Sequence, residues 1–345
     1  MTTIAALYSI FQAHPVVSTD TRQLPAGCLF FALKGANFNG NKFAAQALEN
    51  GAAYAVIDDP NYQSSERCLL VPDVLKALQD LANYYRHTFD IPVIAIGGSN
   101  GKTTTKELVS SVLSAHYSCH FTKGNLNNQI GVPLTLLSMP LSTEVAIIEM
   151  GTNKSGDIQE LCQIAQPTHG LLTNIGKEHL EGFGNLDGVK KAEGELFDYL
   201  AQNHGCAFVN LSEKYLPAMS KKVPMRVGYQ RVEGLKKEPG IIEVQLLEDI
   251  PLVRVAFLSD EGPKVEVTTQ LFGQHNFQNV MTAIALGIYF KVPPEKIREA
   301  LASYAPRNNR SQLLELRGAT ILLDAYNANP SSMRPALQSL CAMPA

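Results

Sequence analysis

The sequence predicts an α/β protein in which a small N-terminal α/β unit precedes a larger unit built on a mostly parallel sheet. Three observations support this fold class. Short apolar runs alternate with helical patterns up to about residue 85, the alternation becomes a regular strand-helix-strand rhythm from Ile91 onward, and a glycine-rich turn joins an apolar run to a helical pattern at Gly97–Thr103. Such alternation is typical of a parallel sheet that is covered by helices on both faces.

The N-terminal part contains two expected strands and two expected helices. The apolar runs Cys28–Leu33 and Ala53–Ile57 indicate buried strands, and the spacing of apolar residues predicts helices over Lys42–Glu49 and Val74–Tyr85. Residues typical of turns separate these elements, namely Asn39-Gly40-Asn41, Asn50-Gly51 and Asp58-Asp59-Pro60. Together they indicate a small α/β unit.

The middle of the chain alternates between predicted strands and helices. Apolar runs predict strands at Pro92–Ile96, Tyr117–Phe121, Val145–Met150 and Gly170–Thr173. Helical spacing predicts helices at Lys102–Ala115, Ile158–Ala165 and Val189–Ala201. This order favours parallel strands connected by crossover helices.

The C-terminal part has a different pattern. Between about residues 220 and 270 the helical spacing is lost, and Ile241–Leu247 and Leu252–Leu258 are predicted to form a hairpin. Helices are expected again at Asn276–Phe290 and Pro294–Tyr304. A strand at Thr320–Leu323 and a short helical stretch end the chain, and this unfinished unit predicts that most of a further domain is missing.

Composition excludes several classes of function. The chain has 345 residues, which favours two or three domains, and its net charge of −3 gives no basic surface for nucleic acid. No apolar run reaches the length of about 20 residues that a membrane span needs, and the N-terminus lacks a signal-peptide pattern. The six cysteines are scattered, without a C-x-x-C pair. We therefore expect a cytoplasmic, monomeric protein.

A candidate phosphate-binding loop follows the expected strand at Pro92–Ile96. It reads Gly98-Ser99-Asn100-Gly101-Lys102-Thr103-Thr104 and leads directly into an expected helix. Glycines allow backbone N–H groups to surround an anion, and the helix adds its positive N-terminal end. Lys102 would reach the β- and γ-phosphates of ATP, and the Thr103 hydroxyl would bind Mg²⁺. The general pattern has glycine where Ile96 stands, so this is a tighter form; an ordinary glycine turn is the alternative.

Seven segments in fixed order extend this observation to nearly the whole chain. They are Asp20-Thr21-Arg22 with Leu29–Gly35, the phosphate loop, Gly124–Pro133, Glu149-Met150-Gly151, His179-Leu180-Glu181-Gly182-Phe183-Gly184, Gly273-Gln274-His275-Asn276, and Asp324-Ala325-Tyr326-Asn327-Ala328-Asn329-Pro330. In this order they resemble the Mur ligases of peptidoglycan synthesis. Seven ordered matches are far more specific than any one motif.

The resemblance implies an ATP-dependent ligase that forms an amide bond through an acyl phosphate. It is greatest to the members that add D-alanyl-D-alanine to UDP-N-acetylmuramoyl-tripeptide, so these two compounds are the expected substrates. It also implies three domains: a UDP-substrate domain at residues 1–85, an ATP-binding domain at 86–311, and the beginning of a Rossmann-like ligase domain at 312–345.

The resemblance assigns the nucleotide-binding residues. Besides the loop from Gly98 to Thr104, it places Lys102 and Arg310 at the γ-phosphate as catalytic residues. It assigns Asn276 to the adenine base and Asp324 to the ribose. Taken alone, Asn276 is equally a residue that caps a helix.

The metal ligands combine local and family arguments. Glu149 ends an apolar strand at the edge where ligands of parallel sheets bind, and it matches the family's Mg²⁺-binding glutamate, beside Thr103. His179 matches the ligand of a second Mg²⁺, which makes it both a metal and a catalytic candidate. The family has a carbamylated lysine fourteen residues after this histidine, and Glu193 stands there. There are two alternatives. Lys191 takes this role after a shift in register, or these charged residues only form a solvated helix face.

The expected substrate residues lie in two groups. Thr21, Arg22, Lys34, Asn39 and Asn41 match the region that binds the uridine diphosphate, although the family turn Asp-Gly-His is Asn39-Gly40-Asn41 here. The second group suits sugar and peptide contacts, with an asparagine-rich turn as the alternative; it contains Asn125, Asn127 and Asn128.

Another member of the Mur ligase family is one alternative function, and two further alternatives stay open. Folylpolyglutamate synthase runs the same chemistry on a related fold, but it has no counterpart of residues 1–85. A non-catalytic fragment that binds UDP-substrate and ATP is the alternative from another class, because only the first strand and helix of the third domain are expected here.

Overall fold

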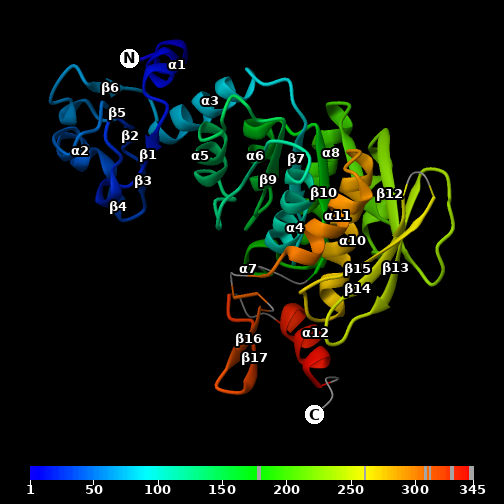
Figure 1. Ribbon diagram of the computed structural model, residues 1–345. Helices are drawn as coiled ribbons and strands as arrows, with labels where there is room; N and C mark the ends of the chain where they lie inside the picture. The colour runs from blue at the N-terminus through cyan, green and yellow to red at the C-terminus, as the bar shows by residue number, and fades with distance from the viewer. Residues whose placement is uncertain (177–179, 260–261, 307–308, 311, 327–329, 342–345) are drawn as a thin grey trace. The chain divides into compact units, whose positions relative to one another are not determined.

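The computed structural model describes residues 1–345 except 177–179, 260–261, 307–308, 311, 327–329 and 342–345 (Figure 1). Its elements group into two compact units. The N-terminal unit contains residues 1–91, 125–141 and 160–166, and the central unit contains residues 92–124, 142–159 and 167–345. The N-terminal unit thus takes in two later segments beyond the expected 1–85.

A four-stranded parallel sheet forms the N-terminal unit. Its order is β1 (Val17–Ser18), β2 (Leu29–Phe31), β5 (Tyr54–Ile57) and β6 (Cys68–Leu70). The predicted helix at 42–49 is a 3-10 turn (Gly40–Phe43) followed by α2 (Ala44–Glu49), and α2 packs on the core around Phe30 and Ala55. The remaining helices are α1 (Ile4–Ala13), α3 (Val74–Arg86) and α5 (Gly131–Leu137), where α3 contacts both others.

A short hairpin and two single turns complete this unit. β3 (Lys34–Gly35) pairs antiparallel with β4 (Phe38–Asn39) directly after β2. The 3-10 turns are Thr21–Gln23 and Pro60–Tyr62. All three lie in the connections that follow or precede the sheet strands, and the 3-10 turn at Pro60–Tyr62 begins in the turn that the sequence predicted at Asp58-Asp59-Pro60.

A nine-stranded sheet forms the central unit. Its order is β15 (Lys264–Thr268), β14 (Arg254–Leu258), β13 (Ile241–Glu248), β12 (Met225–Val232), β11 (Cys206–Asn210), β10 (His169–Leu172), β7 (Val93–Gly97), β9 (Val145–Glu149) and β8 (Cys119–Phe121). The strands from β13 to β8 are parallel, whereas β14 and β15 run antiparallel. The mostly parallel sheet and the β13–β14 hairpin confirm the sequence prediction.

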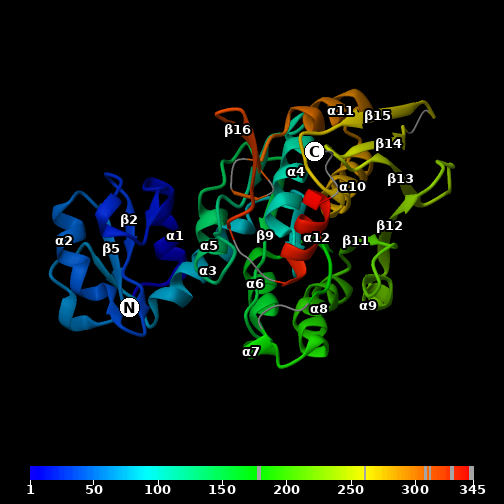
Figure 2. The same ribbon diagram turned by 90° about the horizontal axis from the view of Figure 1, so that it is seen from below.

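Helices cover both faces of this sheet. On one face α4 (Lys102–Ser114), α10 (Gln274–Tyr289) and α11 (Pro294–Ser303) pack together, and on the other lie α8 (Leu186–Gln202) and α9 (Leu216–Met219) (Figure 2). Successive residues of β10 face opposite sides of the sheet and contact these two groups of helices. Leu171 belongs to the core that includes α4, while a Cβ on Gly170 would meet Leu196 of α8. In the described part of the chain, no helix has the length and apolar character that crossing a membrane requires.

Strand β7 lies at the point where the strand order changes direction. β9 pairs with one edge of β7 and β10 with the other, although β8 and β9 both come before β10 in the chain. Ligands of open α/β sheets bind at such points, outside the carboxyl ends of the strands. The segments after β7, β9 and β10 therefore define the candidate site. In the chain, the segment after β9 leads into α6 (Asp157–Ala165), and the segment after β10 leads into α7 (Leu180–Phe183).

The C-terminal segment differs from its prediction. The expected strand at Thr320–Leu323 is β17 (Ala319–Leu323), but it pairs antiparallel with β16 (Gln312–Leu316), which was not predicted. Arg317 and Gly318 between them both have positive φ, as a two-residue hairpin turn of type I′ requires. The helix α12 (Pro330–Cys341) follows.

Candidate nucleotide and substrate sites

Two glycines shape the loop between β7 and α4. Gly98 has a φ of 110°, and a Cβ there would lie 2.4 Å from the hydroxyl oxygen of Thr173. Gly101 has a φ of 81°, and a Cβ there would lie 2.8 Å from Oδ1 of Asn279. Both positions need a residue without a side chain, because the conformation is left-handed and the space is already filled.

The segment after β10 holds this loop by hydrogen bonds. The N–H of Ser99 donates to the carbonyl of Asn174 (2.9 Å), and the N–H of Asn100 donates to Oδ1 of Asn174 (3.1 Å). In return, Asn174 Nδ2 and Thr173 Oγ1 donate to the carbonyl of Asn100 at 2.8 and 2.7 Å. Thr173 and Asn174 are site residues that the sequence reasoning missed; the only local signal is a Thr-Asn pair at the end of a strand.

Lys102 is the first residue of α4, and its ammonium lies over the loop. Nζ donates to the carbonyl of Gly98 and, at 3.3 Å, to that of Ser99. The first N–H groups of a helix have no partner within the helix, and they carry its partial positive charge. The loop, the ammonium and this helix end together form a site suited to a polyphosphate.

Thr103 and Glu149 lie together at the carboxyl ends of β7 and β9. The Thr103 hydroxyl donates to Oε1 of Glu149 at 3.1 Å, and the buried ammonium of Lys106 lies 3.8 Å from Oε2. Burial lowers the pKa of Lys106, while the charges of Glu149 and Glu107 oppose that shift. Hydroxyl and carboxylate oxygens are the ligands that Mg²⁺ prefers, so this pair fits the predicted metal.

Among the described residues, Thr103 and Glu149 do not belong to a larger cluster of metal-binding side chains. Within the described ranges, no group of three or more His, Cys, Asp or Glu residues lies close enough to hold a metal. His179, which the sequence predicted to be a metal ligand, lies outside the described residues. Mg²⁺ keeps several waters and is bound by one or two carboxylates plus substrate phosphates, so Thr103 and Glu149 remain compatible with it.

Glu193 lies under the phosphate loop. Its side chain is fully buried (0% exposed), and Oε2 accepts the N–H of Gly98 at 2.7 Å. Lys191 is exposed, while Lys190 pairs with Asp187 at 3.0 Å. The buried carboxylate, and neither lysine, therefore faces the loop from α8.

Asparagines link α10 to the start of α4. Asn276 donates through Nδ2 to the carbonyl of Phe272 (2.8 Å) and accepts at Oδ1 from Asn279 Nδ2 (3.0 Å). Asn279 Oδ1 in turn accepts from the hydroxyl of Thr105 at 3.0 Å. Asn276, predicted to bind adenine, is thus buried and engaged inside the protein, and Asn279 connects it to the phosphate-binding helix.

Arg310 and Asp324 lie close to this region of the central unit. The guanidinium carbon of Arg310 is 3.8 Å from the ring centre of Tyr326, and its buried Nε has no hydrogen-bond partner among the described residues. Burial lowers the pKa of His275, and the charge of Asp324 opposes that shift, so the two side chains interact. A buried, unpaired guanidinium nitrogen is a group that an incoming anion would satisfy.

The substrate candidates of the N-terminal unit begin at the turn that Thr21 opens. Asp20 Oδ1 accepts the N–H of Arg22 (2.9 Å), and Asp20 Oδ2 lies 2.6 Å from the guanidinium of the same residue. The side-chain hydrogen bond from Arg22 lowers the pKa of Asp20 to about 2. The Arg22 side chain is 86% exposed, so its charge is held at the surface of the unit.

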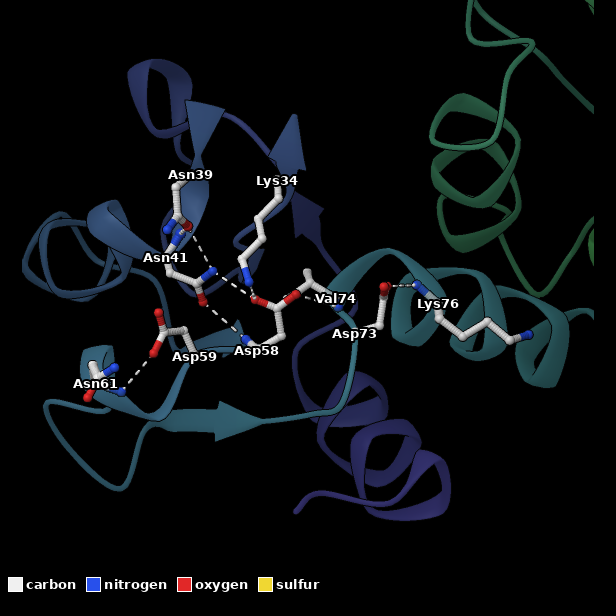
Figure 3. A network of polar contacts seen from close by, with 9 residues as sticks. All are labelled: Lys34, Asn39, Asn41, Asp58, Asp59, Asn61, Asp73, Val74 and Lys76. Carbon is white, nitrogen blue, oxygen red and sulfur yellow. Dashed lines mark hydrogen bonds and ion pairs between the residues drawn. The ribbon is translucent and has the colours of Figure 1, made fainter. Parts of the chain in front are cut away.

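The turn Asn39-Gly40-Asn41 is directed inward. Asn41 is only 1% exposed, and its Nδ2 donates to Oδ1 of Asn39 (2.9 Å) and of Asp58 (2.8 Å). Both amide donors of Asn41 are therefore used inside the unit. Lys34, in contrast, has a side chain that is 46% exposed, and its ammonium pairs with Asp58 at 2.7 Å (Figure 3).

The second asparagine group precedes α5. Asn128 Oδ1 accepts the N–H groups of Ile130 (3.1 Å) and Gly131 (2.9 Å) at the beginning of that helix. Asn125 is exposed, and its carbonyl accepts the N–H of Asn127 at 2.8 Å. Asn128 therefore caps a helix, while Asn125 is accessible.

Family comparison accounts for this arrangement. The model of the Mur ligase middle domain matches residues 96–287, and the model described as Mur ligase family, catalytic domain, matches residues 15–86. The chain belongs to the Mur ligase family. The two matched segments contain the phosphate loop of the central unit and the Arg22 and Lys34 region of the N-terminal unit.

Individual Mur ligases resemble the chain over most of its length. It is 35% identical over 330 residues to the UDP-N-acetylmuramoyl-tripeptide--D-alanyl-D-alanine ligase of Bacillus subtilis, covering 93% of this chain and 69% of that protein. A crystal structure of MurF from Acinetobacter baumannii superposes with a TM-score of 0.84 at 30% identity, covering 96% and 75%. MurF ligase from Thermotoga maritima in complex with ADP gives 0.83 at 25% identity, covering 95% and 75%.

Four of the residues predicted to bind the nucleotide or the metal of this Mur ligase lie together around the phosphate loop. Lys102, Thr103, Glu149 and Glu193 all contact the phosphate loop or each other. The amide of Asn41 is turned into the N-terminal unit instead of outward. The residues predicted to bind the nucleotide and the metal therefore lie together. The residues predicted to bind the substrate are of two kinds, namely exposed charged side chains and asparagines whose amides bond inside the unit.

Proposed function

We propose that this Mur ligase joins D-alanyl-D-alanine to UDP-N-acetylmuramoyl-tripeptide and converts ATP to ADP and phosphate. The observation that carries the proposal is the 35% identity, over 93% of the chain, to the Bacillus subtilis ligase whose name states these two substrates. The loop geometry supports the use of ATP, as does the likeness to the Thermotoga maritima ligase in complex with ADP.

The reaction brings together two anions, the tripeptide carboxylate and ATP, and the amine of D-alanyl-D-alanine. The terminal carboxylate of the tripeptide attacks the γ-phosphorus of ATP, the bond to the leaving ADP breaks, and an acyl phosphate forms. The amine of D-alanyl-D-alanine then attacks the acyl carbon, loses a proton and expels phosphate. Lys102 and Arg310 are proposed to balance the charge on the phosphoryl oxygens, because each presents a cation beside the loop or α4. Asn276 and Asp324 are proposed to lie at the adenosine.

Thr103 and Glu149 are proposed to hold Mg²⁺, with His179 and Glu193 as further ligands or as groups that bind its water. Bound Mg²⁺ would neutralise charge on the transferring phosphoryl group. Glu149 is suited to this role because its two oxygens already lie beside a hydroxyl and an ammonium, which fix its orientation.

The uridine diphosphate is proposed to bind the N-terminal unit at Thr21, Arg22 and Lys34. Arg22 and Lys34 bring accessible positive charge, as a diphosphate requires. Asn39 and Asn41 are proposed to shape the turn beside Lys34, since their amides bond within the unit. The exposed asparagine segment is proposed to contact the sugar or peptide, through Asn125, Asn127 and Asn128.

A phosphate-release assay with a panel of amines tests this function. With ATP, Mg²⁺ and UDP-N-acetylmuramoyl-tripeptide present, we expect release that depends on D-alanyl-D-alanine and a product whose mass includes both substrates. D-alanine and L-glutamate serve as comparison amines. Release that depends on L-glutamate instead, or the absence of binding of the UDP-substrate by calorimetry, would contradict the proposal.

Glu193→Gln tests whether a carboxylate replaces the family's carbamylated lysine. The variant keeps the shape and an oxygen acceptor for the N–H of Gly98, so charge is the main change. We expect the Mg²⁺ concentration needed for tight ADP binding and for turnover to rise roughly tenfold. We also expect the unmodified protein to work equally well with and without added bicarbonate.

Glu195→Gln is the matched control for that variant. Glu195 lies two residues later on α8 and also accepts a backbone N–H, but from Gly156 (2.7 Å) instead of from a residue of the phosphate loop. It should leave the Mg²⁺ dependence unchanged. An unchanged Mg²⁺ dependence in folded Glu193→Gln protein, or bicarbonate stimulation of the unmodified protein, would refute the substitution.

A further inference from the structure

Asp58 contacts both Lys34 and the Asn39-Gly40-Asn41 turn, two features between which the sequence showed no connection. It directly follows β5, and Lys34 lies three residues after the end of β2. β2 and β5 are adjacent parallel strands, so their carboxyl ends meet at the same edge of the N-terminal sheet. That edge is where the ligands of open α/β sheets bind.

The carboxylate of Asp58 is fixed from three directions (Figure 3). Oδ1 lies 2.7 Å from the ammonium of Lys34 and accepts Asn41 Nδ2 at 2.8 Å, while Oδ2 accepts the N–H of Val74 at 3.3 Å. The N–H of Asp58 donates to Asn41 Oδ1 at 3.0 Å. Its side chain is 10% exposed. The hairpin, the asparagine turn and the start of α3 thus all meet at one carboxylate.

Both charges of the pair persist near neutral pH. Burial alone would raise the pKa of Asp58, but the hydrogen bonds from Lys34, Asn41 and Val74 outweigh it and lower that pKa. The hydrogen bond to Asp58 raises the pKa of Lys34. Asp58 is therefore a carboxylate and Lys34 an ammonium in the pH range where a ligase acts.

The exposure of Lys34 distinguishes this pair from an ordinary structural ion pair. Its side chain is 46% exposed, and ion pairs of that kind contribute little to folding. An ammonium has three N–H donors, of which Asp58 takes one. A long side chain that is already held in place loses less freedom when it binds an anion, and this raises affinity.

We propose that Asp58 is a positioning residue for the UDP-substrate, which holds the ammonium of Lys34 where the diphosphate binds. Asn41 supports it by donating to the carboxylate oxygen that Lys34 contacts and by accepting the N–H of Asp58. The inference rests on the proposed function, because the ligand is taken to be the uridine diphosphate of that substrate. Asp58 itself does not touch the ligand.

A double-mutant cycle tests whether Asp58 acts through Lys34. Calorimetry with UDP-N-acetylmuramoyl-tripeptide compares the unmodified protein, Asp58→Asn, Lys34→Met and the double variant. We expect Asp58→Asn to weaken binding roughly tenfold, and to have less than a twofold effect once Lys34 is absent. A purely structural residue would weaken binding equally in both backgrounds.

Two further variants keep the test decisive. Asp59→Asn makes the same change one residue later. That carboxylate accepts the N–H of Asn61 at 3.0 Å and acts on Lys34 through its charge alone, so the variant should change binding less than twofold. Asn41→Ala leaves both charges in place but removes two contacts of Asp58, so it replaces Asp58→Asn in the cycle if that variant does not fold. We expect Asn41→Ala to weaken binding less than Asp58→Asn does, and this loss of affinity should also disappear once Lys34 is absent.

The outcomes separate this inference from the proposed function. Unchanged or tighter binding in folded Asp58→Asn protein would overturn the positioning role, since the carboxylate would then compete with the diphosphate for Lys34. An equal loss with and without Lys34 would overturn it too. If the unmodified protein does not bind the UDP-substrate, the proposed function itself fails, and the inference falls with it.

Discussion

Lys102→Ala is expected to reduce ATP turnover at least about a hundredfold while the protein stays folded. The ammonium contacts the carbonyls of Gly98 and Ser99 in the loop, and its loss removes a cation whose stabilising effect increases as charge develops on the phosphoryl oxygens. The shape of the loop depends instead on Gly98 and on backbone contacts with Asn174. Phosphate release, ADP calorimetry and thermal unfolding together check this result.

Lys76→Ala provides the matched control for that experiment. Lys76 is an exposed lysine of α3 whose partner is Asp80, one helical turn away. Turnover and melting temperature should both stay at the level of the unmodified protein. Phosphate release by Lys102→Ala within about threefold of that level would contradict the assignment of the nucleotide site.

Gly98→Ala should destabilise the protein by about 3 kcal/mol and abolish nucleotide binding, since the strain of a left-handed residue adds to an overpacked contact. A methyl group there would lie 2.4 Å from Oγ1 and 2.6 Å from the backbone nitrogen of Thr173. That nitrogen cannot withdraw freely, because its N–H donates to the carbonyl of Gly97 at 3.0 Å. Denaturant unfolding and ADP calorimetry measure the two effects.

Gly156→Ala separates strain from packing. Gly156 has a φ of 95°, similar to that of Gly98, but a Cβ there would meet nothing within 4 Å. We expect a loss of about 1–2 kcal/mol from backbone strain alone, without an effect on nucleotide binding. If both alanine variants lose the same stability, close packing against Thr173 is not the reason that Gly98 must be glycine.

Most elements with continuous apolar patterns could be predicted from the sequence, although β11, which is also buried throughout, was missed. β7 and β9 consist of buried residues throughout, so their runs of valine, isoleucine and alanine predict strands directly. β12 was missed because its residues are mostly part-exposed and show no apolar run, and β16 because it lies in a short hairpin. Strands of that kind are fixed by their neighbours in the sheet, which local sequence does not reveal.

The same division applies to the site. Lys102, Thr103 and Glu149 were predictable because a loop motif and a strand end are local features. The contact of Asn100 with Asn174 joins residues 74 positions apart, and that of Thr105 with Asn279 joins residues 174 apart. No periodicity encodes such pairs. Asn41 shows the converse, because its family position indicated a ligand contact while its amide bonds within the unit.

The carbonyl of Asn100 accepts hydrogen bonds from both Thr173 and Asn174, and the amides of Ser99 and Asn100 are also bonded to Asn174. The loop backbone is therefore ordered when the chain folds. A nucleotide that arrives there restricts side chains such as Lys102, but little backbone, so the conformational entropy lost on binding is small. Folding itself therefore sets the shape of the loop at which we propose that the phosphates bind.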